Sequence, residues 1–171
     1  MSVSIRRLRE DDASVISTAF SRLGWSKPIT QYQAYYRQQE EGSATVLVAE
    51  VDGQFAGYLK IEWKPEYPPF AEQSIPEIQD LNVLPEFRRR GVASALMDHA
   101  EKTVARVSPE VGIGVGLHPG YNVAQRMYVR RGYVPDGRGV TWGGEFITEY
   151  QPVVADDDLV LHLTKRLTGA R

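Results

Sequence analysis

Residues 44–63 contain two strand-like stretches, ATVLVAEV and QFAGYLKIEW, joined by the dipeptide Asp52-Gly53. β-Branched and aromatic residues favour strands, and an Asp-Gly pair suits a two-residue hairpin turn whose central residues have positive φ. The segment therefore predicts a β-hairpin. A chain with a hairpin pairs neighbouring strands antiparallel, which excludes an all-helical fold and a purely parallel sheet.

The rest of the chain alternates between strand-like and helix-like patterns. We predict further strands at about residues 2–8, 77–83, 111–118 and 158–167, and helices at about 9–20, 28–42, 91–107 and 122–132. We also expect one short strand after Gly132. Hairpins and helical crossovers in one chain indicate a mixed α/β sheet of six to seven strands flanked by about four helices. The length suits a single domain that covers residues 1–171.

Two segments are predicted to be irregular. Pro65, Pro68 and Pro69 break the chain after the hairpin. The segment between Tyr133 and Asp156 is long and rich in glycine, acids and aromatic residues, which is typical of a functional or mobile loop. We therefore expect connecting loops in both places.

Composition limits the classes of function. The formal net charge is −2, whereas nucleic-acid-binding proteins usually have a basic face and a high isoelectric point. The chain has no cysteine, which excludes disulfides, thiolate metal sites and a cysteine nucleophile. His99, His118 and His162 lack metal-ligand spacing, so we expect no metal site. Without a signal-peptide pattern or a membrane-spanning run, we expect a cytoplasmic protein with no nucleic-acid or membrane partner.

The stretch FRRRGVASALM places three arginines directly before a predicted helix. A helix N-terminus carries partial positive charge, so cations there are unfavourable unless an anion neutralises them. The free N–H groups of a helix start, a loop that Gly91 permits, and the guanidinium groups of Arg88, Arg89 and Arg90 together suit a pyrophosphate. Solvated arginines that bind nothing are the alternative interpretation. The chain has neither a G-x-x-x-x-G-K motif nor a G-x-G-x-x-G motif after a strand.

Two stretches together resemble signatures of the GNAT superfamily of acyl-CoA-dependent N-acyltransferases. In that family a strand ends in a V-x-P-like turn, and Q/R-x-x-G-x-G/A then begins a helix. A second signature, A-x-x-x-Y followed by x-x-x-G-F/Y, lies on a later short helix. The matching residues are Arg88, Gly91 and Ala93 in the first signature and Ala124, Tyr128, Gly132 and Tyr133 in the second. The resemblance covers nearly the whole chain and implies a GNAT-like, mostly antiparallel sheet.

The resemblance implies that the chain binds acetyl-CoA and transfers its acetyl group to an amine within a ternary complex. The pyrophosphate would bind the loop and the helix start. Main-chain groups of the preceding strand would pair with the pantetheine amides, as an added strand does. The implied cofactor-binding residues are Leu81, Val83, Arg88, Arg89, Arg90, Gly91, Val92 and Ala93.

The resemblance also leads to two catalytic candidates. Tyr128 is the candidate proton donor to the leaving thiolate, since a phenol has a pKa of about 10 and a simple thiol about 8.5. Some family members have a catalytic glutamate at the position of Glu77, which makes this residue the candidate base. Asp80 and water are the alternatives. Strict alternation points Glu77 and Asp80 to opposite faces of a strand unless a bulge intervenes.

The sequence does not specify the acceptor. Acids and aromatic residues in the two irregular segments suit a cationic amine through charge and cation–π attraction. We therefore expect a primary amine of a small molecule, a peptide or a protein. These residues are Glu66, Glu72, Glu145, Glu149, Tyr67, Phe70, Trp142, Phe146 and Tyr150.

Other functions and an oligomer remain open at this point. A catalytically silent acyl-CoA-binding module is the main alternative to an enzyme. A nucleic-acid-associated protein that uses the three arginines is a second alternative, against which the net charge argues. If the strand at 158–167 lies at the edge of the sheet, it offers a contact for a homodimer.

Residues 112–122 raise three smaller expectations. Alternating glycines in a strand indicate either the close approach of a cofactor or the packing of a helix. His118, at the end of this strand, has no identifiable carboxylate partner and is expected to be structural. The asparagine is expected to cap a helix, because the family's cofactor-contacting asparagine would fall one residue earlier. The residues concerned are Gly112, Gly114, Gly116, His118, Tyr121 and Asn122.

Overall fold

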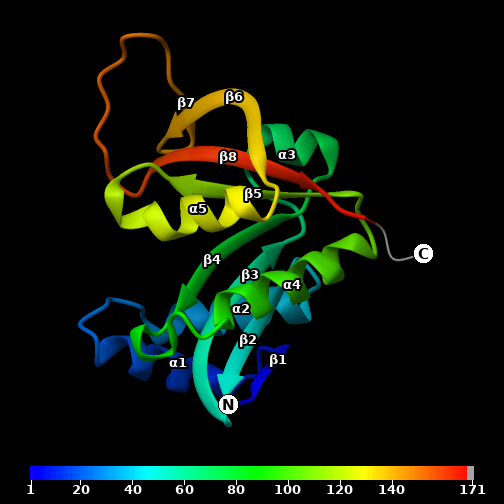
Figure 1. Cartoon of the computed structure of the whole chain (residues 1–171), viewed down its shortest axis with the longest axis vertical. Helices are drawn as coiled ribbons and strands as arrows, with labels where there is room; N and C mark the ends of the chain where they lie inside the picture. Colours follow the sequence, from blue (N-terminus) through cyan, green and yellow to red (C-terminus); the bar gives the residue numbers. More distant parts are fainter. Residues whose placement is uncertain (169–171) are drawn as a thin grey trace. The chain divides into compact units, whose positions relative to one another are not determined.

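The computed structural model describes residues 1–168, which form two compact units (Figure 1). The first unit contains Met1–Lys64 and Ile78–Thr103. The second contains Pro65–Glu77 and the described residues from Val104 onward. Each unit has its own strands, helices and buried side chains.

The sheet of the first unit runs in the order β1 (Val3–Arg7), β2 (Ala44–Val51), β3 (Gln54–Glu62) and β4 (Glu77–Val83). β1 pairs antiparallel with β2, and β2 pairs antiparallel with β3. The turn residues Asp52 and Gly53 have φ of 50° and 80°. The predicted hairpin is therefore confirmed, with the positive φ values that its Asp-Gly turn requires.

Helices bury the apolar side of this first sheet. α1 (Asp12–Ser21) and α2 (Ile29–Glu40) pack against each other, and α2 also packs on β2. The 3₁₀ turn η1 (Pro85–Phe87) leads from β4 to α4 (Val92–Ala105). The helix predicted at about residues 91–107 is α4, and its apolar residues recur at helical spacing and face the core. Fully buried helical side chains include Ile16, Phe20, Tyr32, Leu96 and Met97.

The second unit contains a wholly antiparallel set of strands. Their order is β5 (Glu110–Gly116), β8 (Leu159–Arg166), β6 (Val134–Trp142) and β7 (Glu145–Phe146). α3 (Pro68–Gln73), η2 (Pro119–Tyr121) and α5 (Asn122–Arg130) belong to the same unit. Figure 1 shows the strongly curved β6 next to β8, and α5 along β5.

The proline-rich segment after the hairpin is helical, contrary to expectation. Pro68 and Pro69 occupy the first positions of α3. A proline lacks only an N–H that the first helical turn does not use, and its fixed φ suits a helix start. The prolines therefore begin an element as well as ending one.

Part of the predicted loop between Tyr133 and Asp156 is also regular structure. Residues 134–142 form β6, which pairs with β8 on both sides of an interruption between Pro135 and Val140. Gly137 and Gly139 lie in this interruption and have φ of 83° and 76°. The short strand expected after Gly132 is therefore present, and it is longer than expected because the interruption hides the alternation of its second half.

β8 lies between β5 and β6, so it is not an exposed edge as the sequence suggested, and the possible homodimer stays a prediction without this edge to support it. The described residues form eight strands and five α-helices, against six to seven strands and about four helices expected. The predicted fold class, mixed α/β with a mostly antiparallel sheet, is confirmed. No described helix combines the length and the apolar character needed to cross a bilayer.

Candidate active site

Residues 88–91, the arginine loop, connect η1 to α4 in the first unit. Arg89 and Gly91 have φ of 60° and 78°, and these left-handed residues turn the chain into the helix. The three arginines of the loop are exposed, whereas Val92 is buried in the core. The first N–H groups of α4, which have no partner within the helix, therefore follow directly after three accessible guanidinium groups.

Two of the three arginine side chains lie beside aromatic rings, and all three carry charge without an acidic partner among the described residues. The guanidinium of Arg88 lies 5.8 Å from the ring centre of Trp25, and that of Arg90 lies 5.8 Å from the ring centre of Phe87. None of the three forms an ion pair with a described residue. Planar guanidinium donors and helix N–H groups together suit a phosphate or pyrophosphate group. The donor set therefore fits the diphosphate expected from the sequence.

The end of β4 lies against the arginine loop. The Val83 carbonyl accepts a hydrogen bond from Arg88 Nε at 3.2 Å. Gly57 on β3 allows the close approach of β4, because a Cβ there would meet the Asn82 carbonyl oxygen at 2.5 Å. Leu81 and Val83 are half-buried. All eight predicted cofactor-binding residues thus lie in the first unit, and two of them, Val83 and Arg88, are in direct contact.

Asp80 interrupts the regular pleat of β4. Its φ is 52°, a left-handed value that changes the alternation of a strand as a β-bulge does. Its carboxylate accepts hydrogen bonds from side chains of β3, β4, α2 and the loop after α1, which together form the Asp80 cluster. The donors are Tyr58 Oη at 2.7 Å, Asn82 Nδ2 at 2.7 Å, Tyr35 Oη at 2.9 Å, Gln31 Nε2 at 3.2 Å and Lys27 Nζ at 3.4 Å.

The tyrosines around Asp80 are protonated at neutral pH. Burial, followed by the charge of Asp80, raises the pKa of both Tyr35 and Tyr58. Tyr32 Oη lies 3.1 Å from Tyr58 Oη, and burial raises the pKa of Tyr32 to about 12. A carboxylate has about four acceptor sites, so five donors saturate it. Asp80 is therefore suited to binding a cation and poorly placed to remove a proton from a substrate.

Glu77, the candidate base, lies in a different environment in the second unit. It is 7% exposed and is therefore a buried acid. Its Oε1 lies 3.6 Å from the Cβ position that a side chain at Gly114 would occupy, and Cδ2 of His162 lies at the same distance from that position. Glu77 and His162 thus both lie within van der Waals reach of this position on β5, while an added Cβ would collide with Val160 Cγ1.

His162 is a buried imidazole that the sequence did not single out. Its ring stacks on Tyr67 with centroids 3.5 Å apart and lies edge-on to Phe70. Burial lowers its pKa to about 4, so the ring is neutral at neutral pH. Among the described residues its Nδ1 has no hydrogen-bond partner. The pairing of β5 with β8 places His162 opposite Gly114, and no sequence pattern links these distant positions.

The other glycines of β5 are covered by aromatic side chains of the second unit. A Cβ at Gly112 would collide with the ring of Phe70, and one at Gly116 would collide with the ring of Tyr121. Phe70 belongs to α3 and Tyr121 to η2. For Gly112 and Gly116, the structure therefore supports packing by the chain's own side chains rather than the close approach of a cofactor.

Tyr128 lies on α5 and is 6% exposed, with its ring 5.9 Å from that of Tyr133. Burial raises the pKa of Tyr128 to about 12, so the phenol keeps its proton at neutral pH. A simple thiol has a pKa of about 8.5, so full proton transfer from this phenol to a thiolate is uphill by about 5 kcal/mol. The comparison of pKa values made from the sequence therefore points the wrong way. Tyr128 suits hydrogen-bond donation to a thiolate rather than its complete protonation.

His118 has a carboxylate partner, Asp157, which the sequence did not identify, and its structural role stays a prediction. His118 Nδ1 accepts the N–H of Gly120 at 3.1 Å, so its Nε2 carries the proton that Asp157 accepts at 2.7 Å. Tyr121 Oη also donates to Asp157, at 3.1 Å. Asn122 is the first residue of α5, Tyr121 occupies the cap position, and no side-chain cap bond forms. The expectation that Asn122 caps this helix is wrong.

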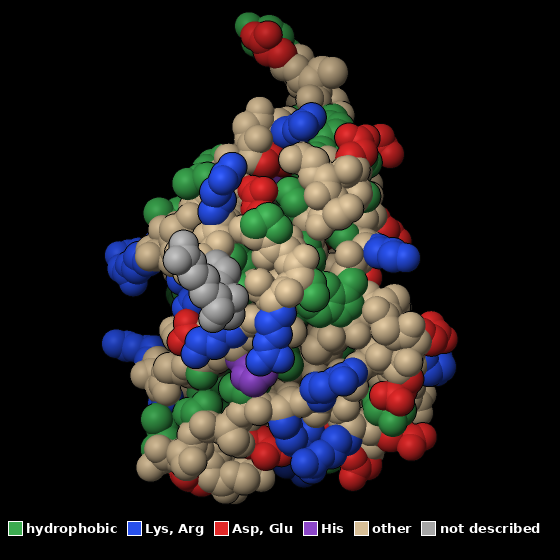
Figure 2. Space-filling view, turned by 90° about the vertical axis from the view of Figure 1, so that its right-hand side faces the viewer, with side chains coloured by type: hydrophobic (Ala, Val, Ile, Leu, Met, Phe, Trp, Pro, Cys, Tyr) green, Lys and Arg blue, Asp and Glu red, His purple; other side chains and the backbone are tan. Residues whose placement is uncertain are grey.

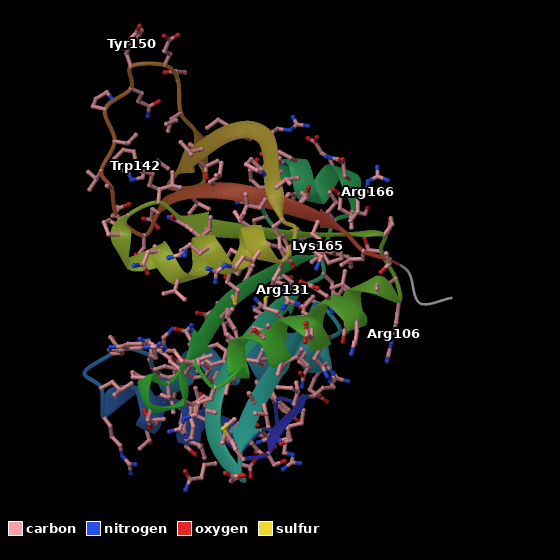
Figure 3. All side chains as sticks on the ribbon, in the orientation of Figure 1. Arg106, Arg131, Trp142, Tyr150, Lys165 and Arg166 are labelled. Carbon is pink, nitrogen blue, oxygen red and sulfur yellow. The ribbon has the colours of Figure 1, made fainter. Side chains whose placement is uncertain are left out.

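The aromatic residues expected on the acceptor side divide between the core and the solvent. Tyr67 and Phe70 are buried, and Tyr67 Oη donates to Asp136 at 2.6 Å. Figure 3 shows Trp142 near the end of β6 and Tyr150 at the tip of the loop between β7 and β8. Tyr150 is 94% exposed. These side chains therefore do not line one common surface.

A family model described as the acetyltransferase (GNAT) family matches residues 6–133 of this chain. The chain belongs to this family. An uncharacterized N-acetyltransferase of Archaeoglobus fulgidus is 39% identical over 57 residues, which cover 32% of this chain and 37% of that relative. The chain thus matches little more than a third of the length of this curated relative.

Solved structures show the same fold at low sequence identity. One from Desulfovibrio desulfuricans, described as a GNAT-family acetyltransferase, has a TM-score of 0.72 at 16% identity and covers 98% of this chain and 100% of its own. YncA from Salmonella typhimurium, solved with its cofactor acetyl-CoA, has a TM-score of 0.70 at 14% identity and covers 100% of this chain and 97% of its own. The GNAT fold expected from the two signatures is therefore confirmed.

Proposed function

We propose that this GNAT-family chain is an acetyl-CoA-dependent N-acetyltransferase that moves an acetyl group to a primary amine of a small molecule, peptide or protein. The arginine loop carries this proposal. It presents three exposed guanidinium groups, without acidic partners among the described residues, at the start of the 14-residue helix α4. Family membership supports an acyl-CoA rather than another diphosphate as the ligand.

The first unit supplies the groups for donor binding. The guanidinium groups of Arg88, Arg89 and Arg90 and the N–H groups of residues 91–93 bind the pyrophosphate. Main-chain groups of Leu81 and Val83 bind the pantetheine arm, and the Val83 carbonyl has a second lone pair beside its bond to Arg88. When bound, acetyl-CoA supplies an activated acetyl thioester.

Two buried residues of the second unit carry the proton chemistry of the proposal. An alkylamine has a pKa of about 10.4 and is mostly charged at neutral pH, so it must lose a proton before it attacks. Glu77 accepts this proton, and the neutral ring of His162 adds no competing positive charge. Tyr128 donates a hydrogen bond that stabilises the thiolate as the carbon–sulfur bond breaks.

The surface charge supports a small cationic acceptor more than a nucleic acid. On the face drawn in Figure 2, Lys and Arg side chains are interspersed with Asp and Glu. The formal net charge is −2. Neither observation matches the basic stripe that nucleic-acid binding requires.

A catalytically silent acyl-CoA-binding module is the second candidate function. The burial of both Tyr128 and Glu77 favours it, because each must contact a reacting group to act. The two candidates share the donor site and differ only in turnover. A spectrophotometric thiol-release assay with acetyl-CoA and a broad panel of amines separates them: release above the hydrolysis rate supports the enzyme, and its absence with every amine supports the module.

Calorimetry with coenzyme A tests the donor site itself. Gly91→Ala places an L-residue at a φ of 78°, and we expect this to weaken coenzyme A binding about tenfold by displacing the N–H groups of the helix start. Gly42→Ala is a matched control, since its φ is 79° and an added Cβ meets nothing within 4 Å at either position. Wild-type protein that shows no heat with millimolar coenzyme A would contradict the proposal.

A further inference from the structure

Lys27 places its ammonium group in a site built from an acid and two aromatic rings. Its Nζ lies 3.4 Å from Asp80 Oδ1 and 3.1 Å from Tyr58 Oη. The same atom lies 5.4 Å from the ring centre of Phe20 and 5.7 Å from that of Tyr58. Phe20, Tyr58 and Asp80 form what we call the ammonium cage. A carboxylate beside aromatic faces is the arrangement that attracts a compact alkylammonium ion.

The ammonium cage is held together without Lys27. Asp80 accepts shorter hydrogen bonds from Tyr58, Tyr35 and Asn82, at 2.7, 2.9 and 2.7 Å. The 3.4 Å contact with Lys27 is the longest of the five donor contacts to Asp80. Lys27 is thus the most weakly held member of the Asp80 cluster. Its loss would leave the carboxylate in place.

The charged edge of the site is partly accessible, whereas Phe20 and Tyr58 are fully buried. The side chain of Lys27 is 19% exposed and that of Asp80 is 22% exposed. Lys27 lies in the loop between α1 and α2 rather than within a helix. A partly exposed lysine on a loop can leave a surface carboxylate at low cost, because ion pairs of this kind contribute about 0–1 kcal/mol. Another ammonium ion can therefore replace Lys27.

The ammonium cage suits the binding of a charged amine and does not suit the attack of that amine on a thioester. A carboxylate near an amine stabilises the charged form of that amine and raises its pKa. The attacking nitrogen needs the opposite, because only its neutral form is a nucleophile. Asp80 is saturated with donors, so it is not free to take up the proton. A group held here is therefore a bound ammonium and not the reacting amine.

We propose that the ammonium cage binds a second, non-reacting alkylammonium group of the acceptor, and that Lys27 is an internal occupant which the acceptor displaces. The inference rests on the proposed N-acetyltransferase function. It narrows the acceptor to molecules or peptides with two amino groups on an unbranched alkyl chain, since the present occupant is itself an ammonium on such a chain. Asp80 also adjoins Leu81 and Val83, the strand residues assigned to the pantetheine arm.

Steady-state kinetics with 1,5-diaminopentane and n-pentylamine tests the displacement. Removal of an internal competitor held by about 1 kcal/mol lowers the KM by about sixfold, so we expect Lys27→Met to do this for the diamine only. Asp80→Asn raises the KM for the diamine about tenfold or more and leaves the monoamine unaffected. Lys64→Met, which removes an exposed lysine beyond the end of β3, is the control and changes neither KM. Equal effects of Lys27→Met on the two amines, or a higher KM for both, overturn the proposal.

A thermal-unfolding experiment tests the same site without acetyl-CoA, so it separates failure of this inference from failure of the proposed function. Lys27→Ala removes the atoms of an n-propylammonium ion. We expect millimolar n-propylammonium to raise the Tm of this variant in a saturable way, and n-propanol to have no such effect. The double variant Lys27→Ala/Asp80→Asn should not respond. Equal responses to the alcohol and the ammonium ion, or a response that persists without the Asp80 charge, contradict an ammonium site.

Discussion

Two carboxylates of β4, Asp80 and Glu77, are neighbours in the sequence and differ in almost every physical respect. Asp80 is partly exposed and saturated by five donors, one of them a lysine. Glu77 is 7% exposed and lies over Gly114 with a neutral imidazole. In our proposals the same acidic group thus serves cation binding in one setting and proton transfer in the other. Partners and burial decide the role of a carboxylate, and residue type alone does not.

The largest expected effect is a loss of kcat on replacement of Glu77. Glu77→Gln keeps the shape of the side chain and removes the base, and loss of a positioned general base costs about 100-fold or more in kcat. We expect this loss with coenzyme A affinity unchanged by calorimetry. Asp80→Asn is the matched variant on the same strand, and we expect it to act on the KM for a diamine, with kcat within about threefold. If Asp80→Asn instead abolished kcat while Glu77→Gln did not, the two assignments would be reversed.

A smaller effect concerns the pH dependence of stability near Glu77. The folded-state pKa of His162 is about 4, against 6.5 for the free side chain, because burial disfavours the charged ring. The unfolded chain therefore binds the proton more readily, and the free energy of unfolding falls as the pH drops from 6.5 to 4. Allowing for partial solvent screening, we expect the loss to be about 2 kcal/mol.

His162→Leu should flatten this pH dependence, as measured by urea unfolding at several pH values. His99→Gln serves as the control, since His99 is an exposed residue of α4. A wild-type protein whose free energy of unfolding stays constant between these pH values would show that His162 is not buried in its neutral form. Glu77 lies close to the ring, so the slope should be measured in Glu77→Gln as well.

The smallest expected effect is a loss of stability when a hydrogen-bond donor to Asp80 is removed. Tyr58→Phe removes the hydroxyl that donates to Asp80 at 2.7 Å and lies 3.1 Å from Tyr32 Oη. The same hydroxyl accepts from Lys27 Nζ at 3.1 Å, and loss of even one of these hydrogen bonds costs about 1 kcal/mol, so we expect the free energy of unfolding to fall by at least that amount. Tyr36→Phe should change it by less than about 0.5 kcal/mol, because that hydroxyl is solvated. Equal effects of the two variants would argue against an ordered Asp80 cluster.

Local patterns predicted most elements of the fold. The hairpin around Asp52-Gly53, the apolar stripe of α4 and the strand that became β4 all follow from alternation, helical spacing or turn chemistry. Prediction failed where a local rule had two outcomes. Pro68 and Pro69 can end one element or begin another, and Gly137 and Gly139 interrupt β6 without ending its pairing with β8.

The candidate site also has one part that could be predicted from the sequence and one part that could not. The arginine loop could be predicted because its residues are contiguous, so the physics of a helix start applies directly to the sequence. The Asp80 cluster could not, because Lys27, Tyr35 and Tyr58 come from three separate elements. One expectation from the sequence concerned this region: a bulge would change the relation between Glu77 and Asp80. The φ of 52° at Asp80 provides such an interruption.

The sequence by itself determined the fold class, the family signatures and the loop of arginines before α4, because each depends on residues close together along the chain. Tertiary structure alone decided which charges have partners. It surrounded Asp80 with donors, and it placed Glu77 and His162 over Gly114. The physical reason is that hydrogen bonds and desolvation act over a few ångströms in space, and strand pairing decides which distant residues come that close.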